Sequence, residues 1–140
     1  MPSKGRTLNR ILRVRTLQLG LTQAEEARAN ERVASEAALR NRIAQLSAGV
    51  APAEAAADAL SFIAAAHFRE RLHQSAAAAD QRLRNAEALH TRANEATKAA
   101  RRDQSAVEKL IARDAATQAL KEVRALEAAP PLRKVRHDPC

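Results

Sequence analysis

Residues 53–129 read AEAAADALSFIAAAHFRERLHQSAAAADQRLRNAEALHTRANEATKAARRDQSAVEKLIARDAATQALKEVRALEAA and contain neither glycine nor proline. These two residues interrupt helices more strongly than any others. The stretch therefore predicts one long helix, or two helices fused end to end, with a length on the order of 110 Å at 1.5 Å per residue. A helix of that length cannot bury one face in a small globular core, so it requires a second long helix as its partner.

Residues 6–48 are expected to form that partner helix, because their apolar residues recur at steps of three and four. Gly20 interrupts the pattern at a cost of about 1 kcal/mol, but no turn residues flank it, and the helix is predicted to continue through it. The predicted contact stripe consists of Leu8, Ile11 or Leu12, Val14, Leu17, Leu21, Ala24, Ala34, Ala38, Leu39, Ile43 and Leu46.

A break between the two helices is predicted at residues 47–52, which read SAGVAP. Gly49 can adopt the left-handed conformation that ends a helix, and Pro52 suits the first turn of the next one. So short a link makes the helices antiparallel neighbours. The predicted fold class is all-α: an antiparallel two-helix coiled-coil hairpin with helices at about 6–48 and 53–128, in which the second helix overhangs the first. Pro130 and Pro131 end it, and residues 129–140 form a basic, flexible tail.

A hairpin folded about residue 50 brings together residues whose numbers add up to roughly 101. Leu39 is then expected near Phe62 and Ile63, Leu17 near Leu83, and Leu12 near Leu89. The first helix would end opposite residue 95, and residues 97–128 would project without a partner. Their apolar residues, expected to seek another chain, are Val107, Leu110, Ile111, Leu120, Val123 and Leu126.

Composition limits the chain to a single domain with few large core residues. It has 140 residues, two phenylalanines, no tyrosine and no tryptophan, and a formal net charge of +8. That charge favours an acidic protein, an anionic lipid surface or nucleic acid as partner. The single cysteine, Cys140, fits a reducing compartment, and we expect a cytoplasmic protein. The basic start, with no acidic residue before Glu25, also suits a mitochondrial presequence, but the helical pattern continues without a cleavage-like break.

The sequence predicts no catalytic, cofactor-binding or metal site. The four histidines are not spaced as zinc ligands, no serine lies in a nucleophile elbow, and there is no glycine-rich phosphate loop. We therefore expect a protein without enzymatic activity. The histidines, read as solvated helix residues, are His67, His73, His90 and His137.

Two groups of residues are candidates for binding. Basic residues are expected to collect at the open end of the rod, away from the turn; nucleic acid is the weaker partner for them because stacking aromatic residues are absent. Phe68 and Leu72 form an i, i+4 pair whose face continues through Ser75 to Ala79; this face is either part of the contact between the helices or an exposed docking strip. The basic residues of the open end are Arg6, Arg10, Arg13, Arg92, Lys98, Arg101 and Arg102.

Two segments resemble the FliJ/YscO family, the coiled-coil stalk proteins of flagellar and injectisome type III export. Residues 8–15, LNRILRVR, look like the basic, leucine-containing start of that family. Residues 101–113, RRDQSAVEKLIAR, are similar to its second-helix segment, in which arginines flank a Glu-Lys-Leu core. The length, the charge and the position of the hairpin agree over nearly the whole chain, whereas the alanine-rich second helix and the tail after Pro131 depart from the family.

The resemblance implies a stalk that enters the central hole of a hexameric export ATPase and also contacts a membrane export gate and export chaperones. It would place the protein in the cytoplasm, peripheral at the inner face of the bacterial cell membrane. The family contacts the gate through a strip of the form Phe-x-x-x-Leu-x-x-Ala-x-x-x-His, which Phe68 and Leu72 match and in which Ser75 and Ala79 replace the last two residues. The ring-contact residues would be Arg6, Arg10, Arg13, Arg101, Arg102, Val107, Leu110 and Ile111.

Overall fold

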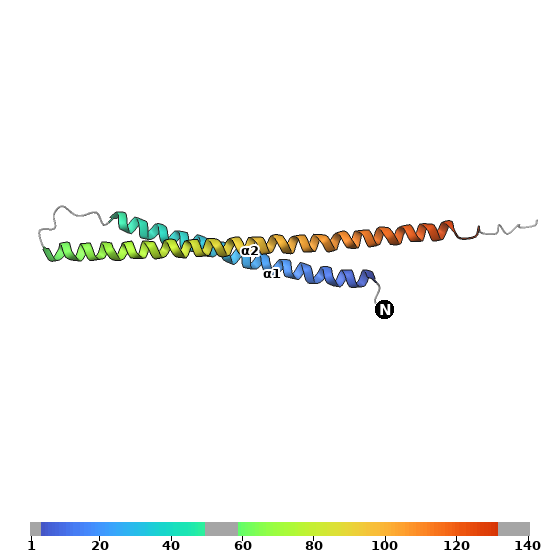
Figure 1. Ribbon diagram of the computed structural model, residues 1–140, viewed down its shortest axis with the longest axis horizontal. Coiled ribbons are helices and arrows are strands. Elements are labelled where there is room, and N and C mark those ends of the chain that lie inside the picture. The colour runs from blue at the N-terminus through green and yellow to red at the C-terminus, as the bar shows by residue number, and fades with distance from the viewer. Residues whose placement is uncertain (1–3, 50–58, 132–140) are drawn as a thin grey trace, which may run out of the picture.

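The computed structural model describes residues 4–49 and 59–131, and these form two long helices packed side by side. Helix α1 spans Lys4–Gly49 and helix α2 spans Ala59–Glu127. They run antiparallel, which confirms the predicted helical hairpin, and α2 extends past α1 at both ends of the rod (Figure 1). No described helix is both long enough and apolar enough to cross a membrane.

The link between the helices differs in part from the prediction. Ser47, Ala48 and Gly49 still belong to α1, so the helix continues through the first half of the predicted turn. Gly49 does not have a positive φ, so it does not form the expected left-handed cap. Helix α1 also continues through Gly20 as predicted. Pro52 and the predicted start of the second helix at residue 53 lie outside the described residues, as does most of the tail.

Cross-helix side-chain contacts define the register. The carboxylate of Asp103 accepts a hydrogen bond from the Arg15 guanidinium at 3.1 Å, and Glu36 accepts one from Arg82 at 2.9 Å. Near the two ends of α1, Lys4 lies 3.9 Å from Asp114 and Arg40 lies 3.3 Å from Asp80. In each of these pairs the two residue numbers add up to 118 or 120.

The register predicted from the sequence, in which the numbers add up to 101, is therefore wrong. Leu39 lies level with Asp80 rather than with Phe62 and Ile63. Leu17 lies level with residues near Asp103 rather than with Leu83, and Leu12 with residues near Val107 rather than with Leu89. The prediction paired large apolar residues with one another, whereas alanine is the commonest residue with which α2 packs against α1. Residues 97–116, expected to project freely, are paired with α1.

Residues of α2 that are buried or half-buried recur at alternating steps of four and three, the heptad pattern of a coiled coil. Small side chains at many of these positions let the helix axes approach closely. We call the line of contact between the helices the seam. Its α2 positions are Arg69, Leu72, Ala76, Ala79, Leu83, Ala86, His90, Ala93, Thr97, Ala100, Gln104, Val107, Ile111 and Asp114.

The seam positions of α1 follow the same heptad spacing but include several polar residues. Only part of the predicted apolar stripe, namely Leu8, Leu12 and Ile43, lies on the seam. The seam residues of α1 are Gly5, Leu8, Leu12, Arg15, Leu19, Thr22, Glu26, Ala29, Val33, Glu36 and Ile43. A heptad seam winds two helices around each other, and α1 correspondingly crosses from one side of α2 to the other along the rod (Figure 1).

Two segments of α2 have no described residue of α1 at their level. The first, residues 59–68, is the N-terminal extension of α2, and the second, residues 117–127, is its C-terminal extension (Figure 1). Both carry exposed apolar side chains. Phe62 and Ile63, predicted to lie in the seam, belong to the N-terminal extension and are exposed. The exposed large apolar residues of the two extensions are Leu60, Phe62, Ile63, Phe68, Leu120, Val123 and Leu126.

Candidate docking surfaces

The predicted ring-contact residues fall into an exposed set and a seam set. Arg6, Arg10 and Arg13 are exposed on α1. Among the described residues none of the three has an ion-pair partner. On α2, Leu110 is about half exposed, whereas Val107 is buried and Ile111 is half-buried because both face α1. The intact hairpin therefore offers the arginines and Leu110 to a partner, but not Val107. The other exposed members of the predicted set are Arg101 and Arg102.

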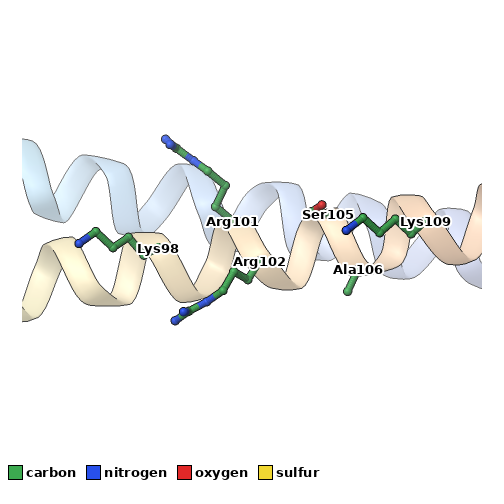
Figure 2. A pocket seen from close by; sticks show the side chains of 6 residues that line it. All are labelled: Lys98, Arg101, Arg102, Ser105, Ala106 and Lys109. Carbon is green, nitrogen blue, oxygen red and sulfur yellow. The ribbon is translucent and has the colours of Figure 1, made fainter.

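A shallow groove on α2 is bordered by four cationic side chains. Figure 2 shows Arg101 and Arg102 extending to opposite sides of the helix, with Ala106 on the side of Arg102. Lys98 donates a hydrogen bond to Glu95 at 3.0 Å, whereas no ion pair with a described residue is found for Arg102 or Lys109. We call Lys98, Arg101, Arg102 and Lys109 the cationic row. It spans about 17 Å along the helix and attracts anionic groups.

The predicted gate-contact residues do not share one exposed face. Phe68 is half exposed and Ser75 is exposed, but Leu72 is half-buried and Ala79 is buried at 2% relative exposure. Leu72 and Ala79 occupy seam positions, which agrees with the interpretation of this face as part of the contact between the helices. The exposed part of this region is formed instead by Phe68 with Phe62 and Ile63 of the N-terminal extension.

Sequence reasoning missed an exposed apolar stripe on α1. The sequence predicts Val14, Leu17 and Leu21 in the contact between the helices, yet these residues are 53%, 65% and 67% exposed, and Ile11 is 40% exposed. The seam beside this stripe contains Arg15, Thr22 and Glu26, so it is the less apolar of the two stripes. Hydrophobicity alone points to the wrong one. A pairing of oppositely charged residues across the helices, such as Arg15 with Asp103, is the signal that could have identified the seam.

The two seam carboxylates of α1, Glu26 and Glu36, have different surroundings. Glu26 accepts a hydrogen bond from the side-chain amide of Asn94 at 2.6 Å. This bond is the main cause that holds the pKa of Glu26 below its ordinary value of 4.5; Thr97 and the charges of His90 and Arg101 act in the same direction, and burial opposes them. Glu36 is paired with Arg82 through Oε1, while its Oε2 is buried and has no hydrogen-bond partner among the described residues.

Within the described ranges, no three histidine, cysteine or acidic side chains come together as a metal site would require. The grooves on the surface are shallow and are lined by helix side chains. In comparisons with known proteins, no family model, no curated protein and no solved structure matches this chain. The docking surfaces are therefore interpreted from their own geometry and charge.

Proposed function

We propose that this chain is a non-enzymatic stalk and recruiting component of a flagellar-type protein export apparatus. The observation that carries the proposal is the open end of the hairpin, where the C-terminal extension of α2 projects past the start of α1. Leu120 and Val123 are exposed on that projection, and basic residues of both helices lie behind it. The family resemblance of residues 8–15 and 101–113 supplies the proposed partner, a hexameric export ATPase.

A rod of this kind suits the central hole of a ring. Six identical subunits cannot match one asymmetric hairpin at every contact, so fixed, buried ion pairs would fit poorly. Long-range attraction between the basic end and an acidic ring, together with an apolar surface that can slide, allows many equivalent positions. Arg6, Arg10, Arg13, Arg101 and Arg102 provide the charge in this proposal. Leu110 and the C-terminal extension provide the apolar surface, in place of Val107 and Ile111 of the seam.

Contacts with the export gate are assigned to the other end of the rod. Phe62, Ile63 and Phe68 are exposed there, and in this proposal they replace the predicted strip that runs through Leu72 and Ala79. Through the gate, the ATPase and the export chaperones the protein would be held at the inner face of the cell membrane.

The test separates the two ends. Charge reversal at Arg10, Arg13, Arg101 and Arg102 should reduce association with the ATPase ring by at least about tenfold, since four attractive contacts become repulsive, and should abolish any stimulation of ATP hydrolysis. Reversal of the exposed Arg42 and Arg71, near the closed end of the hairpin, is the matched control and should leave both unchanged. Phe68→Ala should weaken gate binding alone. Unchanged ATPase stimulation after the four reversals would contradict entry by this end.

The cationic row supports a second candidate, a basic coiled coil that binds nucleic acid. Both phenylalanines lie at the far end of α2, so the row has no aromatic residue on which bases could stack. It would contact phosphates only and read no sequence. Binding through about four phosphates should weaken more than tenfold between about 50 and 200 mM salt. Fluorescence anisotropy with a single-stranded DNA of mixed sequence measures this, and Lys98→Gln with Arg102→Gln should reduce the salt slope.

A further inference from the structure

The outer face of α1 combines exposed aliphatic side chains with cations that form no ion pair with a described residue. We define this face by Ile11, Val14, Leu17 and Leu21 together with Arg6, Arg10 and Arg13. Leu17 and Leu21 are about two-thirds exposed, because the seam that binds α2 uses Leu12, Arg15 and Leu19 on the opposite side of α1. Neither the proposed entry into a ring nor the cationic row of α2 uses these aliphatic residues.

The charge along this face has one sign. Residues 4–24 include five basic residues and no acidic one. Two of the five, Lys4 and Arg15, are paired with Asp114 and Asp103 of α2, and the other three are free of ion pairs with any described residue. A face about 22 Å long can therefore lie against an anionic surface without one repulsive contact from α1.

We propose that the outer face of α1 binds the surface of an anionic phospholipid bilayer, with the helix lying parallel to it. The four aliphatic side chains would enter the boundary between headgroups and acyl chains, while the arginines beside them bind lipid phosphates. Basic amphipathic helices bind membranes in this way, and their affinity rises with the apolar area buried and with the anionic charge of the lipid. Each cation at such a surface contributes roughly fivefold in affinity.

Two other occupants fit this face less well. A second copy of the chain would bring two surfaces of the same strong positive charge together, which opposes association. A helix of a protein partner would need a groove between two helices, whereas Leu17 and Leu21 are about two-thirds exposed on the side of α1 away from α2. Protruding aliphatic side chains between arginines suit a deformable, anionic bilayer surface better than the fixed surface of a folded protein.

Vesicle flotation tests the proposal with the full chain at about 0.15 M salt. Vesicles of phosphatidylcholine with about a third phosphatidylglycerol should bind the wild type at least about tenfold more tightly than pure phosphatidylcholine vesicles. Leu17→Asp with Leu21→Asp should lower binding to the anionic vesicles at least tenfold. The matched control, Leu120→Asp with Val123→Asp on the C-terminal extension, should bind like the wild type. Circular dichroism checks that both variants remain helical.

Three results would overturn the proposal. The first is a wild type that does not float with anionic vesicles, including the case in which it instead binds an acidic amphipathic peptide through Leu17 and Leu21. The second is equal binding by the Leu17/Leu21 variant and the wild type. The third is binding that is lost only when Lys98, Arg101, Arg102 and Lys109 become glutamine, which would assign the lipid to the cationic row. Stimulation of the ATPase by the Leu17/Leu21 variant is expected to persist, so the two proposals can fail separately.

Discussion

In the middle of the hairpin alanine is buried, whereas at both ends of α2 phenylalanine and leucine are exposed. Ala79 retains 2% of its accessible surface, but Phe62 retains 59% and Leu126 retains 75%. All the residues buried within the described ranges lie between Ala79 and Val107, where α1 covers α2 along its whole length. The comparison shows that position relative to the second helix, rather than side-chain hydrophobicity, decides burial in this rod.

The central seam and the two extensions of α2 also differ in the interactions that stabilise them. The central seam combines small apolar residues with cross-helix hydrogen bonds such as Glu26–Asn94 and Arg82–Glu36. Exposed ion pairs contribute little stability, but a seam of alanines fits more than one register, so specific polar pairs help select one. The extensions of α2 have neither form of support from α1. Their exposed apolar residues are therefore available for binding partners rather than for folding.

The first and largest effect expected is an all-or-none crosslink that reports the register. With Cys140→Ser as background, cysteines at Leu19 and Ala100 should be joined efficiently by a short thiol crosslinker, because both positions lie on the seam at the same level. Cysteines at Leu17 and Leu83 should not be joined, and gel mobility after oxidation or crosslinking measures both. Efficient joining of Leu17 to Leu83 would restore the register with the turn at residue 50.

A second test compares the loss of a side chain in the seam with a loss in an extension. Leu83→Ala should lower the free energy of unfolding by about 2–3 kcal/mol, because the side chain is nearly buried and leaves a cavity. Phe62→Ala removes a larger side chain, yet should change the free energy of unfolding by less than about 0.5 kcal/mol, because Phe62 is exposed. Urea unfolding followed by circular dichroism gives both values. Equal losses for the two variants would mean that the N-terminal extension is covered as well as the seam.

The smallest effect concerns pH. The pKa of Glu26 is lower in the folded chain than its ordinary value of 4.5, so the unfolded chain binds this proton more readily. The stabilisation is therefore fully present above about pH 5 and is lost as the pH falls below 4.5 through the folded pKa. Glu26→Gln should be less stable than the wild type at pH 7 and lose less stability between pH 5 and 3, as measured by urea midpoints.

The neighbouring Glu25→Gln is the control for this change, because Glu25 is exposed and forms no cross-helix bond among the described residues. It should keep the pH dependence of the wild type. If the Glu26 and Glu25 variants have the same pH profile, the bond from Asn94 does not stabilise the seam.

Much of the architecture could be predicted from the sequence, and the docking surfaces only in part. The absence of glycine and proline from residues 53–129 indicated the long second helix, and the steps of three and four indicated the first. The basic residues Arg6, Arg10, Arg13, Arg101 and Arg102 could be selected from the sequence because a charged side chain is identified by residue type alone. All five are exposed. Val107, Leu72 and Ala79, named as candidate binding residues, lie in the seam. The sequence could not show this, because the register of the partner helix decides which face of a helix is covered.

The sequence by itself determined two helices, their antiparallel order and the basic character of the open end, because helix propensity and charge are local properties. Only the tertiary structure decided the register, the seam and the two extensions. Alanine favours helix wherever it stands and packs acceptably in several registers, so the alanine-rich α2 does not specify its partner residues by hydrophobicity. The register depends on pairs such as Arg15–Asp103 and Glu36–Arg82. The two residues of each pair are far apart in the chain, and neither stabilises the register until they are in contact. In this register Leu17 and Leu21, which were expected in the core, are exposed.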